Sequence, residues 1–282
     1  MPVSLPSALV PFLDMLRCPA CRARLHPALG ALRCPAGHTF NIARQGYVSL
    51  LTGARATSGD DAAMARSRDR FLPTGRYAPI RQAAARLVED ALPDQGTVMD
   101  VGCGTGYYLA GVLDQLPGAR GLGLDTSVRA LRSSARAHER AAAASWDVFR
   151  PFPLADGVAD VVLNVFAPRN PSEFHRVLRP SGRLIVVRPT QRHLAELRGQ
   201  VPAMVKVDPA KEQRLSQALG PFFEAADSQQ VEYVASLTRQ ESLDLLGMTP
   251  SARHLDHVDL RDDVLLPDRV TVSVLATAYQ PR

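Results

Sequence analysis

The sequence reads Val98-Met99-Asp100-Val101-Gly102-Cys103-Gly104-Thr105-Gly106 where a hydrophobic strand runs into a glycine turn and then a helix. Glycines permit positive φ angles and let a ligand lie against bare backbone. Asp125 closes the next predicted strand, nineteen residues after Gly106. A carboxylate at that position can accept hydrogen bonds from both hydroxyls of a ribose. This arrangement predicts a nucleotide-type ligand at the carboxyl edge of a parallel sheet.

The glycine spacing narrows the identity of that ligand. Gly102-x-Gly104-x-Gly106 differs from the Gly-x-Gly-x-x-Gly turn that holds a dinucleotide pyrophosphate. The spacing therefore favours S-adenosylmethionine over NAD, with the three glycines and Asp125 as its binding residues. Cys103, inside the turn, is most simply a small buried residue and not a nucleophile.

The segments around the turn alternate between strand and helix patterns. The expected strands are 97–101, 121–124, 159–166 and 183–187, and the expected helices are 107–116, 128–138 and 171–178. Strands joined through helices need crossover connections, so the pattern predicts an α/β fold with a doubly wound, mostly parallel sheet covered on both faces. Residues 269–279 indicate an edge or final hairpin strand. Residues 58–92 indicate helix, with Thr57, Ser58 or Asp60 as possible caps.

Two later strand ends supply candidate contacts. Trp146-Asp147 lies where a third strand should end, and Asp147 can accept from an adenine amino group. Asn164-Val165-Phe166-Ala167-Pro168 ends the fourth strand, at the edge where such sheets bind ligands. An amide beside an aromatic ring can hydrogen-bond to a target base and stack on it. The alternatives are core filling for Phe166 and a strand-end cap for Asn164.

Three of the four cysteines and one histidine form two close pairs near the amino terminus. Cys18-x-x-Cys21 is followed after twelve residues by Cys34-x-x-x-His38. Two such pairs complete a tetrahedron of ligands around Zn²⁺ and leave no open position, which predicts a structural zinc site. The module that contains it is expected to fold only with the metal bound. The alternatives are a disulfide with one free thiol, or chance spacing. His26 breaks the spacing and is expected to lie on the surface.

The charge of the chain is concentrated at its amino-terminal end. Residues 1–90 contain twelve Arg and six Asp or Glu, a net of +6, and the remaining 192 residues sum to −1. This asymmetry suits a polyanionic partner, although many basic surfaces bind no nucleic acid. No apolar run is long enough to span a membrane, and no secretion signal is recognisable, so a cytoplasmic protein is expected.

With these motifs assembled, the sequence resembles the 23S ribosomal RNA guanine-N1-methyltransferases. The resemblance runs nearly end to end and rests on the zinc spacing and on Gly46-Tyr47-Val48-Ser49-Leu50-Leu51, Gly75-Arg76-Tyr77, Gly102 to Tyr108, Leu124-Asp125-Thr126-Ser127, Ala167-Pro168 and Arg192-His193-Leu194-Ala195-Glu196-Leu197. The Asn-Val-Phe-Ala-Pro motif is similar to the Gram-positive, macrolide-resistance branch.

The resemblance implies a class I S-adenosylmethionine methyltransferase domain behind a zinc finger. It implies cofactor contacts at Tyr77, Gly104, Thr105 and His193, and zinc at the four residues already named. The implied substrate is a guanine in a 23S rRNA hairpin beside the peptide exit tunnel, of the guanine-748 class, with tylosin-type resistance as the consequence. On the residues alone, Tyr77 is a helix-packing aromatic and His193 a surface histidine.

The expected organisation is a zinc-binding, RNA-recognising module at 1–50, a helical linker at 51–92 and a methyltransferase domain at 93–282. Methyl transfer from a sulfonium mainly requires alignment and exclusion of water. Asn164 is predicted to orient the guanine, and no residue is identifiable as the acceptor of its N1 proton. Arg66, Arg68, Arg70 and Arg76 are predicted to contact RNA phosphates, or else form a solvated helix face.

Two other functions remain open on the sequence. A small-molecule methyltransferase with a purely structural zinc ribbon predicts no salt-dependent RNA binding. A non-catalytic RNA- or protein-binding module predicts no turnover, and the intact glycine turn with Asp125 argues against it. A homodimer is possible, and no membrane partner is expected.

Overall fold

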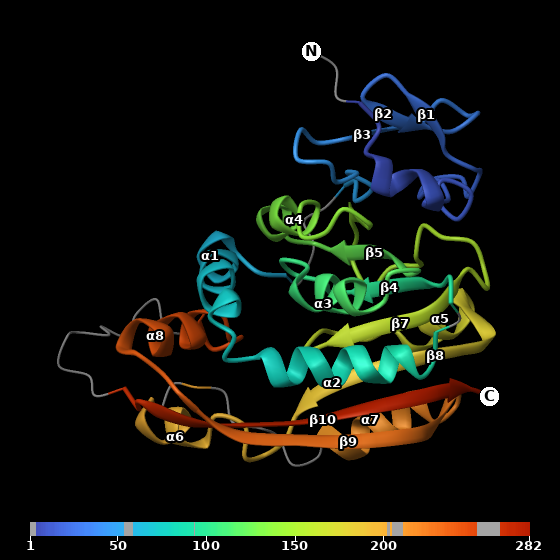
Figure 1. Ribbon diagram of the computed structural model, residues 1–282. Coiled ribbons are helices and arrows are strands. Elements are labelled where there is room, and N and C mark those ends of the chain that lie inside the picture. The colour runs from blue at the N-terminus through green and yellow to red at the C-terminus, as the bar shows by residue number, and fades with distance from the viewer. Residues whose placement is uncertain (1–3, 54–58, 93, 202–203, 205–210, 253–265) are drawn as a thin grey trace.

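The computed structural model describes residues 4–53, 59–92, 94–201, 204, 211–252 and 266–282, and its main feature is a seven-stranded sheet (Figure 1). The strand order is β6-β5-β4-β7-β8-β10-β9. The first five strands are parallel, and β10 is antiparallel to both of its neighbours. The bounds are β4 Thr97–Val101, β5 Arg120–Asp125, β6 Ala141–Ser145, β7 Ala159–Val165, β8 Leu178–Pro189, β9 Phe223–Ser236 and β10 Arg269–Pro281. The predicted α/β fold is confirmed.

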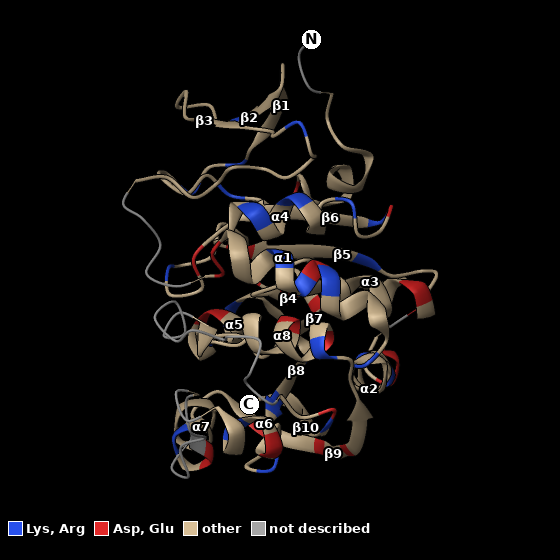
Figure 2. Cartoon of the chain, turned by 90° about the vertical axis from the view of Figure 1, so that its left-hand side faces the viewer, with Lys and Arg blue, Asp and Glu red and all other residues tan. Residues whose placement is uncertain are grey.

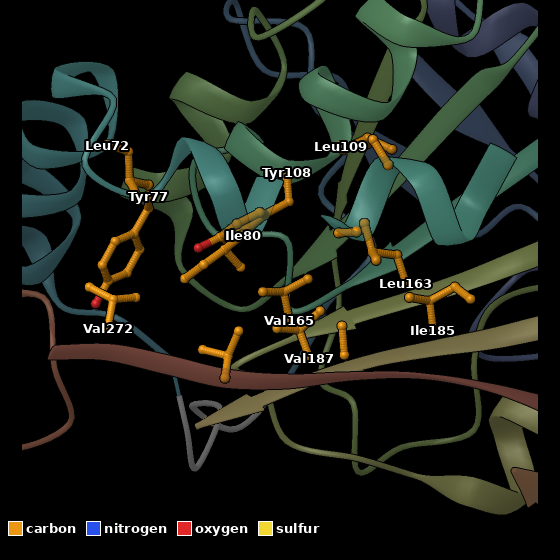
Figure 3. Close-up of a cluster of buried hydrophobic side chains, with 14 of the residues drawn as sticks. Leu72, Tyr77, Ile80, Tyr108, Leu109, Leu163, Val165, Ile185, Val187 and Val272 are labelled. Carbon is orange, nitrogen blue, oxygen red and sulfur yellow. The ribbon is translucent and has the colours of Figure 1, made fainter. Parts of the chain in front are cut away.

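The helices cover both faces of this sheet. Their bounds are α1 Ala62–Phe71, α2 Ala78–Glu89, α3 Tyr107–Gln115, α4 Val128–Ser134, α5 Pro171–Val177, α6 Ala195–Gln200, α7 Lys211–Leu219 and α8 Arg239–Gly247. Side chains from α2, α3, α6 and α8 form one buried cluster with β7, β8 and β10, and Figure 3 shows Ile80 of α2 next to Val165 of β7. A second cluster lies on the other face and includes Phe174 of α5 and Leu219 of α7.

Three expectations about individual elements need correction. Strand β10, predicted as an edge or final hairpin strand, is the last strand among the described residues but not an edge strand, because β9 lies outside it and pairs with it along thirteen positions. Helix α4 ends at Ser134, four residues before the expected His138. Among the expected caps of α1, Thr57 and Ser58 lie outside the described residues, and Asp61 accepts from the N–H groups of Ala63 and Met64 instead of Asp60. Asp60 is engaged in an ion pair with Arg68.

The helical region after residue 58 consists of two helices with a break between them. Helix α1 passes into the short 3-10 helix η2 (Leu72–Thr74), and Gly75 ends it with φ of 80°. Such a left-handed conformation is accessible to glycine at little cost. Tyr77 follows at once as the N-cap of α2 and is buried, so the break determines where this ring lies.

The amino-terminal module packs directly on the sheet. It contains the 3-10 helix η1 (Ser7–Phe12) and a small antiparallel sheet of β1 (His26–Ala28), β2 (Ala31–Arg33) and β3 (Thr39–Asn41). Figure 1 places the module beyond β5 and α4, at the β6 side of the large sheet. Val48 adds backbone pairing to the outer edge of β6, donating to Ala143 O and accepting from Ser145 N–H.

The module covers the part of one sheet face over β5 and β6, beside the part that α5 and α7 cover. The connection from β6 to β7, residues 146–158, contains no helix. Phe12 and Leu16 of the module instead lie in one buried cluster with Leu122 and Ala142 of the sheet. The Arg22 guanidinium donates to the carbonyl oxygens of Phe152 and Leu154, at 2.5 and 2.9 Å. The module and the sheet therefore share a hydrophobic core.

Candidate active site and metal centre

The glycine turn lies at the carboxyl end of β4, as expected. Gly102 has φ of 80°, and a Cβ there would lie 2.4 Å from the Cβ of Ala167 in the turn after β7. Only glycine tolerates both conditions. Gly104 has φ of 53°, and the nearest atom to a Cβ at this position would be the Arg68 Cδ, at 3.9 Å. Its backbone is therefore open to a ligand, and Gly106 begins α3 with φ of 83°.

Asp125 stands beside this turn at the end of β5. Its carboxylate accepts from the N–H of Gly104 and the N–H of Ser127, both at 2.8 Å. Burial raises the pKa of Asp125, and the two backbone donors oppose that rise. A cavity of about 60 Å³ adjoins it, lined in part by Gly102, Trp146 and Pro168. Thr105 lines a second hollow, of about 270 Å³, between α1, α3 and α4.

Asp100 is a further candidate site residue, which the sequence alone did not single out. Its side chain is buried in β4, and Oδ2 has no hydrogen-bond partner among the described residues. Burial, reinforced by the charge of Asp125, raises the pKa of Asp100 from 3.8 to about 8. An acidic residue in an otherwise apolar strand directly before the glycine turn was the available signal. A cationic group of a ligand beside this carboxyl group would lower its pKa again and favour the ionised form.

We expect Asp100→Asn to change the pH dependence of stability. Between about pH 4 and pH 8 the folded protein keeps the Asp100 proton while the unfolded chain has lost it. Unfolding then releases a proton, so the free energy of unfolding falls as pH rises through this window, by about 1 kcal/mol per unit. Asparagine does not titrate. The free energy of unfolding of the variant, relative to that of the wild type, should therefore increase from pH 5 to pH 8 when both are unfolded in urea without ligand. A constant difference would contradict the assigned pKa.

Tyr77 and His193 are brought together from distant parts of the chain. The Tyr77 hydroxyl lies 3.3 Å from His193 Nε2, and His193 Nδ1 accepts from the Ser273 N–H at 3.2 Å. Since Nδ1 is an acceptor, the neutral ring carries its proton on Nε2 and donates it to Tyr77. Burial lowers the pKa of His193 to about 4, so the ring is uncharged at neutral pH.

The ring of Phe166 completes this aromatic group at the end of β7. It stacks on His193 with 5.7 Å between ring centres and contacts Tyr77 at 6.3 Å. Phe166 has φ of 54°, a left-handed conformation that is strained for a phenylalanine. This backbone conformation directs the Phe166 side chain toward Tyr77 and His193.

Asn164 lies on β7 two residues before Phe166 and is fully buried. Its Nδ2 group donates to the carbonyl oxygens of Val101 and Pro168, at 3.1 and 2.9 Å. These bonds tie the turn after β7 to the end of β4. Its Oδ1 has no partner in the described part of the chain, so an acceptor is left over at the carboxyl edge.

Trp146 and Asp147 follow β6 directly, and both are buried. Asp147 Oδ1 accepts from the Phe149 N–H at 3.0 Å. Trp146 lines the cavity beside Asp125, and its Nε1 lacks a partner within the described ranges. The residues around the cavity fit an adenosyl ligand, since they combine an apolar wall, open glycine backbone and buried polar atoms without partners.

The four predicted metal ligands converge in the amino-terminal module. The ligand atoms of Cys18, Cys21, Cys34 and His38 all lie within 4.8 Å of one another. The Sγ atoms of Cys21 and Cys34 are 3.7 Å apart, close to the about 3.8 Å expected along the edge of a ZnS tetrahedron. All four cysteines of the chain are unpaired, so the disulfide alternative is not formed. The donor set fits structural zinc.

Three of the four arginines predicted to contact RNA form ion pairs within the fold. Arg68 pairs with Asp60, Arg70 donates to the buried Asp244 at 2.9 Å, and Arg76 donates to Glu241 at 3.0 Å. The latter two pairs attach α8 to the segment containing α1. Arg66 is exposed and makes no ion pair with the described residues. Figure 2, which looks onto the carboxyl ends of the parallel strands, shows acidic and basic segments close together at α1 and α8.

None of the helices in the described part of the chain combines the length and the apolar character needed to cross a lipid bilayer.

Two family models match the sequence in separate regions. Residues 16–55 match the zinc ribbon described as "RlmA, N-terminal", and residues 98–182 match a methyltransferase domain. The first region contains the four metal ligands, and the second contains the glycine turn and Asp125.

Two curated relatives align with nearly the whole chain. A putative 23S rRNA (guanine-N(1)-)-methyltransferase of Micromonospora griseorubida is 46% identical over 95% of this chain and 98% of its own. The 23S rRNA (guanine(748)-N(1))-methyltransferase of Streptomyces fradiae is 42% identical over 94% of this chain and 96% of its own. Among solved structures, an S-adenosylmethionine-dependent methyltransferase from Thiobacillus denitrificans with bound S-adenosyl-L-homocysteine superposes with a TM-score of 0.51 and 14% identity, covering 80% of this chain and 100% of that one.

Proposed function

Because this chain belongs to the family of 23S rRNA (guanine-N1-)-methyltransferases, we propose that it methylates N1 of a guanine in a 23S rRNA hairpin near the peptide exit tunnel. The methyl donor is S-adenosylmethionine, and the module at the amino terminus is a zinc ribbon. We propose the guanine-748 class of target, named for the Streptomyces fradiae relative, and a contribution to tylosin-type resistance. The observation that carries the proposal is the glycine turn with Asp125 and Asp100 at the carboxyl edge, next to the aromatic group of Phe166.

When bound, S-adenosylmethionine supplies an electrophilic methyl group. We propose that Asp125 binds the ribose hydroxyls, that Gly102, Gly104, Thr105 and Gly106 present their backbone to the ligand, and that Asp100 faces its ammonium group. The protein's task is to align an acceptor atom and exclude water. The buried Trp146, which lines the cavity, supports that exclusion on the adenosyl side.

We propose that Tyr77 and His193 border the same pocket next to the reacting group. His193 is neutral and its Nε2–H is a donor, so it acts by positioning and is not a base. Asn164 is proposed as the residue that positions the guanine, since its amide nitrogen holds the turn after β7 and its Oδ1 remains as an acceptor.

The RNA contacts are proposed for the exposed arginines outside the ion pairs. Arg33 and Arg44 of the zinc module and Arg66 of α1 are exposed and lack acidic partners among the described residues. Each phosphate contact contributes to affinity in a salt-dependent way. Residues 1–50 are thus proposed as the RNA-recognising module, 51–92 as a helical linker, and 93–282 as the catalytic domain. We also expect a cytoplasmic enzyme and a homodimer, which light scattering would test.

Arg66→Ala and Arg70→Ala should separate RNA binding from stability. We expect Arg66→Ala to leave the free energy of unfolding unchanged, weaken hairpin binding several-fold and reduce its salt dependence by about one unit of log–log slope. Arg70→Ala removes the charged partner of the buried Asp244 carboxylate and leaves it with the Gln240 amide. It should therefore lower the free energy of unfolding by about 2 kcal/mol, with hairpin affinity nearly unchanged. The reverse pattern would place Arg70 in the RNA interface.

The reaction itself is tested by transfer of a tritiated methyl group to 23S rRNA from a strain that lacks this modification. Because N1-methylation blocks base pairing, primer extension stops at the modified guanine. A stop in the tunnel hairpin supports the proposal, and a stop at a guanine elsewhere refutes the hairpin. Zinc-loaded protein that binds S-adenosylmethionine but labels no rRNA supports the small-molecule methyltransferase. Hairpin binding without transfer to any acceptor supports the non-catalytic module.

A further inference from the structure

The turn after β6 carries an exposed aromatic side chain. Phe149 is 58% exposed, and it is the one aromatic among the large hydrophobic residues that the described chain leaves exposed. The others are Val10, Leu29, Val128 and Val234. Single exposed aliphatic residues are common on protein surfaces, whereas an exposed ring offers a large flat surface for a ligand.

This ring stands on a rigid base. The buried Asp147 accepts from the Phe149 N–H through Oδ1 and from the Arg150 N–H through its carbonyl, both at 3.0 Å. The Asn170 side chain, in the turn after β7, donates to the Val148 carbonyl at 2.9 Å. The turns after β6 and β7 are thus tied together, and the backbone of Phe149 is fixed while more than half of the residue stays exposed.

The ring lies next to the cofactor cavity but does not line it. Trp146, Val148 and Phe152, from the same turn, line the cavity that contains Gly102 and Asp125, and Phe149 is not among the lining residues. On its other side, Arg150 Nη1 donates to the Thr52 carbonyl in the segment that leaves the zinc module. Phe149 is therefore an outward-facing ring between the zinc module and the catalytic pocket.

The chemistry of the reaction supplies a partner for such a ring. A guanine in a hairpin must leave its stack before N1 can reach the methyl donor, and this exposes the faces of neighbouring bases. Aromatic side chains take up unstacked bases in single-stranded RNA, with little dependence on base identity. The cationic Arg150 is the next residue in the chain, which suits a polyanionic partner.

We propose that Phe149 stacks on an unpaired base that neighbours the target guanine in the rRNA hairpin. This inference rests on the proposed function and adds a base-contacting residue that lies outside the cofactor pocket. In this position the Phe149 ring stabilises the opened hairpin. Removing the ring should therefore weaken RNA binding and leave cofactor affinity unchanged.

The test compares Phe149→Ala with Phe149→Tyr, which keeps the ring, and with Val234→Ala as an exposed control on β9. We expect Phe149→Ala to weaken binding of the hairpin oligonucleotide, and to raise its KM, about tenfold. Phe149→Tyr and Val234→Ala should stay within twofold of the wild type. Calorimetric affinity for S-adenosyl-L-homocysteine should be equal in all four proteins.

An abasic hairpin identifies the stacked base. Replacing each neighbour of the guanine in turn with an abasic nucleotide should, at one position, abolish the difference between wild type and Phe149→Ala. Unchanged RNA binding in Phe149→Ala refutes the inference, and an equal loss of S-adenosyl-L-homocysteine affinity assigns the ring to the cofactor pocket. A change in oligomeric state by light scattering assigns it to a contact between copies of the chain. Failure of the wild type to methylate rRNA would instead overturn the proposed function, and hairpin binding by the variants still decides the role of Phe149.

Discussion

Removing zinc is expected to destabilise the catalytic domain together with the amino-terminal module. Phe12 and Leu16 of the module lie in the same buried cluster as Leu122 and Trp146 of the large sheet, and the β6–β7 connection has no helix to cover them in the module's place. Structural zinc contributes its binding free energy to folding. Loss of about 4 kcal/mol would lower Tm by roughly 8–16 °C for a chain of this size.

The single tryptophan of the chain makes this test specific. Trp146 is buried in the shared core next to the cofactor cavity. We expect Cys34→Ser, or treatment with a chelator, to shift Trp146 fluorescence to longer wavelength and to lower Tm as one cooperative transition. His26→Ala, which removes an exposed histidine from the same module, is the matched control and should leave both unchanged. Zinc loss that leaves Trp146 fluorescence unchanged would mean that the module folds independently of the sheet.

Replacing Asp125 is expected to have the largest effect on cofactor affinity. A charged acceptor for two ribose hydroxyls contributes about 3 kcal/mol in total, which corresponds to about 100-fold in Kd. Asp125→Ala also removes the acceptor for the Gly104 N–H, so the glycine turn loses a support at the same time. We therefore expect an about 100-fold increase in the Kd for S-adenosyl-L-homocysteine, with zinc content unchanged.

Two further variants separate these contributions of Asp125. Asp125→Asn keeps one acceptor oxygen and should fall between wild type and Asp125→Ala. Asp114→Ala removes a largely exposed carboxylate from α3 and serves as the control for net charge. An increase in Kd of less than threefold in Asp125→Ala, measured by calorimetry, would place the ribose elsewhere.

The glycine turn and the metal cluster were predictable because their determinants are local. A strand, a glycine turn and a helix occupy consecutive residues, and the positive φ angles of Gly102 and Gly106 are properties of those residues. The zinc ligands come in two close pairs whose spacing is set by tight turns. Family resemblance, and not the residues themselves, singled out Tyr77 and His193, since nothing in the chain near either one indicates the other.

The β9–β10 pair shows why strand order was harder to predict. Both strands are long, and in β9 the side chains alternate between at least partly buried and exposed only over 229–235, whereas 224–228 are exposed throughout. Helix α8 and residues outside the described ranges separate the two strands in the sequence. Pairing over such a distance depends on which edge the remaining sheet offers, and no short-range signal encodes that edge.

Local patterning thus determined the α/β class, the ligand-binding turn and the zinc ligand set, because each strand or helix pattern, the glycine turn and each pair of zinc ligands is defined by residues close together in the sequence. Tertiary structure decided the ion pairs of Arg68, Arg70 and Arg76, the raised pKa of Asp100 and the exposure of Phe149. Charge pairing and burial depend on which distant segments meet. An arginine on a helix therefore has the same local sequence whether it faces RNA or a carboxylate across the fold.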